Sequence, residues 1–254
     1  MDEQNQSAIV TGGTSGLGAA VARALTDRGV RVGILDLNEK SGVPAAAKIG
    51  AIFAKCDVGK AKSVKDALYS VRAVIGQESI CVNCAGVALA LPTVKSGKPH
   101  DPNLFEKIIK TNLIGTFNVA SQSASGMTEL PLKGRDHSRG VIINTSSMAA
   151  FEGQIGHAAY SASKAGIVGL TLPMARDLAR YGIRVMTIAP GIFSTSMASN
   201  IKDKYKRKIL ESQAYPKRLG KPEEFASLVL HCLDNTMLNG ETIRLDAGCR
   251  MPPR

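Results

Sequence analysis

The chain has 254 residues, of which 44% are hydrophobic, and it carries a formal net charge of +11 at pH 7. This length suits one large α/β domain with a buried core, and the sequence contains no linker, internal repeat or low-complexity tract. No apolar run approaches the roughly 18 residues that a membrane-spanning helix needs, so we expect no insertion into a membrane.

Short apolar runs rich in valine and isoleucine alternate with longer stretches that are compatible with helices. The expected strands are 7–11, 31–35, 51–56, 80–83, 140–145, 183–189 and 242–245, and the expected helices are 17–28, 61–75, 104–127, 158–180 and 222–233. Alternating strands and helices form right-handed βαβ units and a parallel sheet. We therefore predict an α/β fold: one Rossmann-like domain, residues 1–254, with a doubly wound sheet of about seven parallel strands and helices on both faces.

A glycine-rich turn follows the first expected strand and leads into the first expected helix, with the sequence Thr11-Gly-Gly-Thr-Ser-Gly-Leu-Gly18. Glycine permits the tight turn and lets the backbone approach a pyrophosphate, while the helix N-terminus offers free N–H groups. The pattern is typical of a dinucleotide site, which we expect to be lined by Gly12, Ser15, Gly16, Leu17 and Gly18.

Asp36 ends the second expected strand, about 20 residues beyond the glycine turn. Its carboxylate can accept both hydroxyls of an adenosine ribose and would repel a 2′-phosphate, and neither position 15 nor position 37 holds a lysine or arginine. The sequence therefore favours NAD over NADP. Further cofactor contacts are expected at two later strand ends, from Asp57, Val58, Cys84 and Ala85.

Tyr160 and Lys164 are one helical turn apart, so their side chains share a face of the expected helix. A tyrosine hydroxyl has a pKa near 10, and a nearby cation lowers that pKa toward the working range of a base. Ser147, at a strand end, can hydrogen-bond and orient a substrate oxygen. Asn112 lies within an expected helix, where asparagine is unfavourable, so a buried hydrogen-bonding role is the better interpretation.

The turn after the sixth expected strand begins with Pro190-Gly191 and is expected to place Phe193 and Thr195 beside a nicotinamide. Cys81 and Cys84 form a C-x-x-C pair, but side chains three apart on a strand point to opposite faces, and no second ligand pair has zinc spacing. We therefore expect no metal site, and free thiols at the five cysteines.

Together these motifs resemble the short-chain dehydrogenase/reductase family over nearly the whole chain. The family's T-G-x-x-x-G-x-G, N-N-A-G, Tyr-x-x-x-Lys and Pro-Gly patterns match residues 11–18, 83–86, 160–164 and 190–191, with Cys84 in place of the second asparagine. The resemblance implies Tyr160 as acid/base, Lys164 as its tuner and ribose anchor, Ser147 as carbonyl polariser and Asn112 as part of a proton relay. It also implies a homotetramer.

A narrower resemblance is to one subfamily, the type-2 3-hydroxyacyl-CoA dehydrogenases, also called type-10 17β-hydroxysteroid dehydrogenases. Residues 144–153, 171–178 and 238–245 carry it, with polar insertions at 94–103 and 130–139. That subfamily uses NAD to oxidise the secondary alcohol of 3-hydroxyacyl-CoA, and also hydroxysteroids. The resemblance thus implies a small-molecule substrate, an acyl-CoA or a steroid, that contacts Ser147 and Tyr160.

Basic residues concentrate in Lys202-Asp-Lys-Tyr-Lys-Arg-Lys208, within residues 192–221, where the family places a mobile substrate lid. Two interpretations stay open for this segment. Its lysines could meet the phosphates of coenzyme A, or they could form a solvated helix face.

Two other functions remain as alternatives. One is reduction of 3-oxoacyl groups on an acyl carrier protein, although that group generally prefers NADPH and Asp36 counts against it. The other is an RNA-binding or scaffold role in a tRNA-processing complex. The sequence shows no nucleic-acid motif and only 4% aromatic residues, so we do not expect a nucleic-acid partner. The expected location is the mitochondrial matrix or the cytoplasm.

Overall fold

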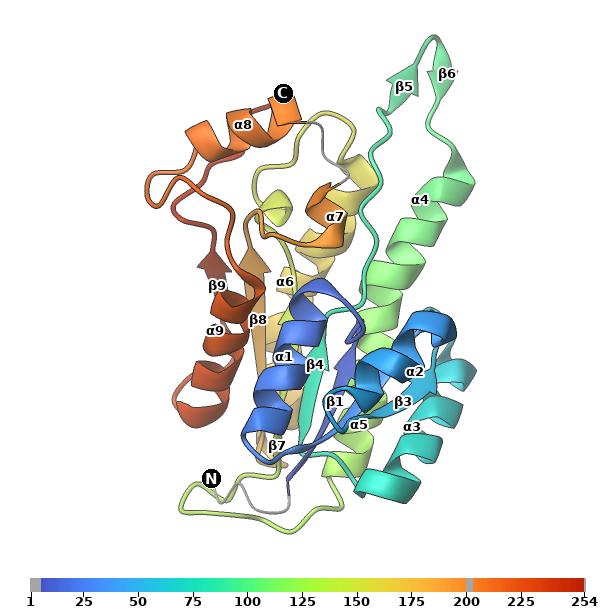
Figure 1. The fold of residues 1–254 in the computed structure, drawn as a ribbon, viewed down its shortest axis with the longest axis vertical. Coiled ribbons are helices and arrows are strands. Elements are labelled where there is room, and N and C mark those ends of the chain that lie inside the picture. Colours follow the sequence, from blue (N-terminus) through green and yellow to red (C-terminus); the bar gives the residue numbers. More distant parts are fainter. Residues whose placement is uncertain (1–5, 200–202, 254) are drawn as a thin grey trace.

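A computed structural model describes residues 6–199 and 203–253 of the chain. Its centre is a seven-stranded sheet with the strand order β3-β2-β1-β4-β7-β8-β9, in which every neighbouring pair is parallel (Figure 1). The strands are β1 (Ser7–Thr11), β2 (Arg31–Asp36), β3 (Ile52–Lys55), β4 (Ile80–Asn83), β7 (Gly140–Thr145), β8 (Ile183–Pro190) and β9 (Thr242–Leu245). All seven expected strands are confirmed, with ends shifted by no more than one residue.

Helices cover both faces of this sheet. One face packs against α1 (Gly16–Asp27), α2 (Glu39–Ala47) and α9 (Pro222–Asp234), and the other against α3 (Ala61–Ile75), α5 (Gly115–Met127) and α6 (Ala158–Ala179). Side chains alternate between the two cores, because Ala8 and Val10 of β1 face the first and Ile9 faces the second. The predicted doubly wound α/β fold is confirmed.

The long expected helix 104–127 is interrupted in the structure. It begins as α4 (Pro102–Ile109), capped by the Asp101 side chain, which accepts the N–H of Asn103 at 2.9 Å. A π-helical turn, η1 (Lys110–Ile114), then joins α4 to α5. Such turns within α-helices are frequent at functional sites, and this one carries Asn112.

Other elements were not expected from the sequence. They are α2, the short η2 (Met148–Ala150), and a hairpin, β5 (Val94–Lys95) with β6 (Lys98–Pro99), which projects from one end of the molecule (Figure 1). Helix α2 shows little apolar periodicity because only Gly42 and Ala46 are buried in it. Gly42 is required there by packing, since a Cβ would lie 2.1 Å from the Phe53 ring.

The expected lid, residues 192–221, contains α7 (Ser196–Ser199) and α8 (Asp203–Glu211). Lys202, the first residue of the basic segment, lies outside the described residues, as does the side chain of Lys204. Among the described helices, none has both the length and the apolar character needed to cross a membrane.

Candidate active site

The glycine positions of the turn between β1 and α1 have little room for a side chain. Gly12 has a φ of +65°, and a Cβ there would lie 2.9 Å from the backbone of Ala85. A Cβ on Gly18 would lie 2.3 Å from the Gly12 carbonyl oxygen, and one on Gly16 would meet Thr195 at 3.2 Å. Ser15 is the exposed N-cap of α1, and cofactor contacts from Ser15 and Leu17 stay a prediction. This bare backbone at a helix N-terminus fits a dinucleotide pyrophosphate.

Asp36 lies beside this turn at the carboxyl end of β2. Its Oδ2 accepts the Thr14 hydroxyl at 2.5 Å, and its Oδ1 accepts the backbone N–H of Asn38 at 3.2 Å. These two bonds hold the carboxylate at the edge of the glycine turn, where the ribose is expected. Neighbouring Leu37 is 64% exposed and carries no charge. The contribution of Thr14 was missed, because a hydroxyl inside a glycine motif is not itself a signal.

The turn after β4 is tied to the end of β1. The Thr11 hydroxyl accepts the backbone N–H groups of both Cys84 and Ala85 at 3.1 Å. Burial raises the pKa of the Cys84 thiol to about 11, so this residue, which replaces an asparagine of the family pattern, is a neutral side chain. The bonds to Thr11 hold this turn beside the glycine turn, and its contact with a nucleotide stays a prediction.

After β3, Asp57 and Val58 occupy the next position along the same rim. The Asp57 Oδ1 accepts the N–H of Gly59 at 3.1 Å, and Lys60 lies 3.3 Å from Oδ2. Val58 is buried against Gly115, where a Cβ would lie 2.6 Å from the valine side chain. An adenine contact from these two residues stays a prediction.

Tyr160 and Lys164 lie on one face of α6, as predicted. The Lys164 Nζ donates to the Thr145 carbonyl at 2.8 Å and lies 5.9 Å from the centre of the Tyr160 ring. Burial lowers the pKa of Lys164 to about 8. The pKa of Tyr160, by contrast, is raised by burial and only partly offset by a hydrogen bond with Ser147. The lowering expected from Lys164 is therefore not seen, because burial and the Ser147 hydrogen bond account for the shift.

Ser147 and Asn112 approach the pair from two other elements. Ser147 caps η2, where its Oγ accepts the N–H of Ala149 at 3.1 Å. Asn112 is fully buried; its Oδ1 accepts the Val87 N–H at 2.8 Å, and its Nδ2 donates to the Val87 carbonyl at 2.9 Å and to the Ser163 Oγ at 3.0 Å. The expected buried hydrogen-bonding role of Asn112 is confirmed.

Gly86 links these groups, a role that its motif alone did not indicate. A Cβ on Gly86 would lie 3.2 Å from the Asn112 Oδ1 and 3.5 Å from the Lys164 Nζ. The carboxamide and the ammonium group therefore approach the same side of this glycine. This arrangement brings together the helix interruption at η1, the turn after β4 and α6.

Phe193 and Thr195 are placed differently from each other. The Phe193 ring is buried and meets the Phe225 ring edge-on, with centroids 6.4 Å apart, so its side chain belongs to the core beneath α9. A contact between Phe193 and the nicotinamide stays a prediction, and with the ring in the core the backbone of this residue is the part left to make it. Thr195, in contrast, contacts the glycine turn at Gly16.

His157 is a site residue that sequence reasoning missed. It precedes α6, and its ring lies edge-on to Tyr160 with centroids 5.9 Å apart. Burial lowers its pKa, so it is neutral at pH 7. The signal that could have revealed it is its spacing, three residues before the tyrosine at the start of the same helix.

Comparisons with known proteins agree with this geometry. The family described as short chain dehydrogenase matches residues 6–206. The 3-hydroxyacyl-CoA dehydrogenase type-2 of Bos taurus is 49% identical over 251 residues, covering 97% of this chain and 95% of that protein. The Drosophila melanogaster protein of the same name is 44% identical, covering 98% and 99%. The crystal structure of 3-hydroxyacyl-CoA dehydrogenase type-2 from Mycobacterium avium superposes with a TM-score of 0.93, at 38% identity and 98% coverage of both chains.

Proposed function

The chain belongs to the short-chain dehydrogenase/reductase family, and on this premise we propose that it is an NAD-dependent dehydrogenase that converts 3-hydroxyacyl-CoA to 3-oxoacyl-CoA. Membership of the family makes it an oxidoreductase that uses a nicotinamide cofactor. The substrate assignment rests on the 49% identity, over nearly the full length, to a protein named for this activity.

The chain's own residues account for the proton chemistry. In the oxidation direction Tyr160 accepts the proton of the substrate hydroxyl, and the Ser147 hydroxyl binds the same oxygen. The buried Lys164 ammonium stabilises the phenolate that forms. The Asn112 carboxamide, which lies on the same side of Gly86 as this ammonium and donates to Ser163, is the proposed next member of the proton relay. The nicotinamide, when bound, supplies the hydride chemistry.

An activity panel tests this proposal. The protein would be assayed with NAD against short 3-hydroxyacyl-CoA thioesters, a hydroxysteroid and a simple secondary alcohol, with NADH formation as the readout. We expect kcat/KM to be highest for the thioesters. If only the simple alcohol is turned over, the protein is a dehydrogenase but acyl-CoA is not its substrate.

Support for NAD comes from Asp36, which Thr14 and Asn38 hold at the ribose edge, next to uncharged Leu37. A carboxylate at this position would repel a 2′-phosphate. Initial rates with NADH and NADPH on a 3-oxoacyl-CoA give the test. A preference for NADPH would reverse the assignment and favour reduction on an acyl carrier protein.

The charge of the lid supports binding of coenzyme A phosphates. Arg207 and Lys208 are exposed on α8, and Lys217 and Lys221 follow in the chain. Substituting Arg207 and Lys208 by serine should raise KM for an acyl-CoA and leave KM unchanged for the same acyl group on N-acetylcysteamine, which has no phosphate. Lys65→Ser, at an exposed position of α3, is the matched control. Equal changes for both thioesters would mean a merely solvated face.

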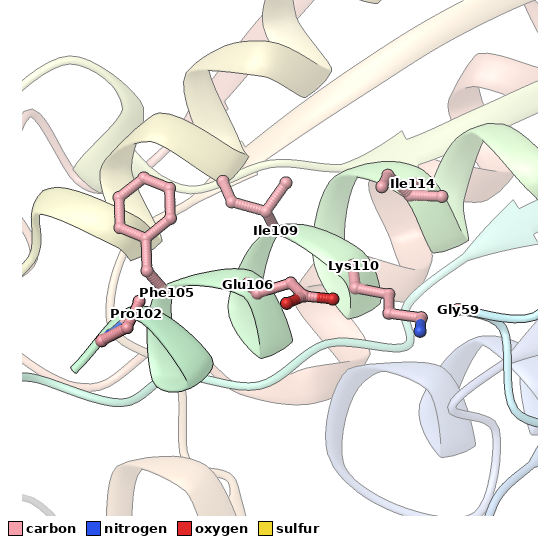
Figure 2. A pocket seen from close by; sticks show the side chains of 7 residues that line it. All are labelled: Gly59, Pro102, Phe105, Glu106, Ile109, Lys110 and Ile114. Carbon is pink, nitrogen blue, oxygen red and sulfur yellow. The ribbon is translucent and has the colours of Figure 1, made fainter.

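A homotetramer is the proposed assembly, and the outer face of α4, η1 and α5 supports it. Phe105, Ile114 and Phe117 are 41%, 46% and 46% exposed there. Figure 2 shows Phe105, Ile109 and Ile114 along a groove of about 580 Å³ that Pro102, Glu106, Lys110 and Gly59 also line. Light scattering after chromatography, with Phe117→Glu as the disrupting variant, tests the assembly. A monomeric unsubstituted protein would contradict it.

A further inference from the structure

The loop from Phe151 to His157 joins the two catalytic segments of the chain. It begins directly after η2, which Ser147 caps, and it ends where α6 brings Tyr160 into the site. The loop also contacts the C-terminal tail. The Gln154 side chain donates to the Pro252 carbonyl at 2.9 Å, and the Ile155 N–H donates to the Pro253 carbonyl at 3.1 Å. The loop between Ser147 and Tyr160 is therefore attached to the tail that follows β9.

Arg244, on β9 at the edge of the sheet, is the centre of this attachment. Its two terminal nitrogens donate to both carboxylate oxygens of Glu152 at 2.7 and 2.8 Å, and its Nε donates to Asp246 at 2.7 Å. It also donates to the Cys249 carbonyl at 3.0 Å and lies 4.8 Å from the centre of the Phe151 ring. One guanidinium thus holds two loop residues and two tail residues.

The end of β9 and the tail that follows it contact the chain at the start of the lid and again after α8. The Leu245 carbonyl accepts the Gly191 N–H at 2.9 Å, where the lid begins. The Ala247 carbonyl accepts the N–H groups of Ala214 and Tyr215 at 3.0 and 3.3 Å, in the segment that follows α8. Figure 1 shows the C-terminal end of the chain beside α8. The tail consequently lies between the loop at 151–157 and the lid.

We propose that Arg244 is a positioning residue that fixes the loop at 151–157 against the lid and thereby shapes the binding site for the acyl part of the substrate. This inference rests on the proposed function. Removing the guanidinium would leave the carboxylates of Glu152 and buried Asp246 near each other without their shared cation. Arg250 lies 3.6 and 3.7 Å from the same two carboxylates but is 63% exposed, so it replaces Arg244 only in part.

Kinetics of Arg244→Met test the role. Ser147 and Lys164 are held by other bonds, to Ala149 and Thr145, so the chemical step should persist. We expect KM for the acyl-CoA to rise about 10- to 100-fold, with kcat and the NADH dissociation constant little changed. Arg244→Lys should recover part of the loss, since a lysine retains the charge without the two-pronged geometry.

Arg28→Met is the matched control. Arg28 also holds a carboxylate in a two-pronged pair, with Asp234 at 2.9 and 3.1 Å, but it joins the ends of α1 and α9 away from the loop and the tail. We expect no change in KM for this variant. A fall in kcat with unchanged KM in Arg244→Met would indicate only loss of folded enzyme and would overturn the proposal.

Hydrogen–deuterium exchange provides a readout independent of the substrate. In Arg244→Met and in Glu152→Gln, exchange should increase in peptides covering 151–157 and 212–216, and it should not increase there in Arg28→Met. Unchanged exchange in both variants would overturn the positioning role even if acyl-CoA is confirmed as substrate. Increased exchange in a protein that fails to turn over acyl-CoA would instead refute only the proposed function.

Discussion

The cofactor side and the substrate side of this site are built in different ways. The cofactor side, at the ends of β1, β2 and β4, depends on backbone shape, with Gly12 and Gly18 packed so closely that a methyl group has no space. The substrate side depends on contacts between distant segments, such as Arg244 with Glu152 and the tail with the lid. Close backbone packing therefore defines one half of the site, and side-chain bonds between distant segments define the other.

The largest expected effect is on the proton transfer itself, with binding on the cofactor side retained. In Tyr160→Phe the ring is retained and the proton acceptor is lost, so kcat should fall about 10²- to 10⁴-fold. The dissociation constant of NADH, measured by fluorescence titration, should stay close to its original value. Tyr181→Phe, on a tyrosine stacked with Arg180 beyond α6, is the control and should leave kcat unchanged. Full turnover in Tyr160→Phe would disprove the assignment of the acid/base.

The next prediction breaks the cofactor side alone. Gly12 and Gly50 have nearly the same φ, +65° and +69°, but a Cβ has open space at Gly50 and meets Ala85 at Gly12. Both alanine variants should lose about 1–2 kcal/mol of stability through backbone strain. Only Gly12→Ala should also weaken NADH binding, by about 100-fold, as titration would show. Equal NADH affinities in the two variants would mean that position 12 needs glycine for its backbone conformation and not for close approach of the cofactor.

The pH dependence follows from burial on the chemical side. Alcohol oxidation needs unprotonated Tyr160, and burial raises the pKa of this hydroxyl above its ordinary value of 10. Below that pKa, kcat/KM for oxidation should rise up to about tenfold per pH unit between pH 7 and 8. Above pH 8 the slope should decrease, because Lys164, with a pKa of about 8, loses the charge that stabilises the phenolate.

Ketone reduction should not show this rise. It needs the protonated hydroxyl, which dominates throughout this range, so its kcat/KM should not rise between pH 7 and 8. Initial rates in both directions over the same buffers give the comparison. An oxidation rate that decreases from pH 7 to 8 would contradict Tyr160 as the base.

The contrast between the two sides also explains what the sequence could predict. The sheet, the glycine turn, Asp36 and the pair Tyr160–Lys164 have local signals, because each depends on neighbours within one strand, turn or helix. The burial of the Phe193 ring had no local signal, since its position depends on Phe225, which is remote in sequence. Arg244 and Glu152 had no signal for the same reason: 92 positions separate them.

The smallest expected effect comes from replacing two helix-capping residues of the same kind and comparing the stability and NADH affinity of the variants. Asn38 caps α2 on the cofactor side by accepting the Ser41 N–H, and Asp101 caps α4 on the substrate side by accepting the Asn103 N–H. Replacing either by alanine should cost about 1 kcal/mol in the free energy of unfolding, measured with urea. The two variants should differ in NADH affinity, because the backbone of Asn38 also holds the Asp36 carboxylate.

We expect Asn38→Ala to weaken NADH binding about threefold, since a cap loss of this size loosens the first turn of α2 without removing the Asp36 bond. Asp101→Ala should lose the same stability and leave NADH affinity unchanged, because α4 follows the hairpin of β5 and β6 and, within the described part of the chain, has no bond to Asp36. If Asp101→Ala weakens NADH binding as much as Asn38→Ala does, a change in α4 reaches the cofactor side. The division of the site into two separately built sides then does not hold.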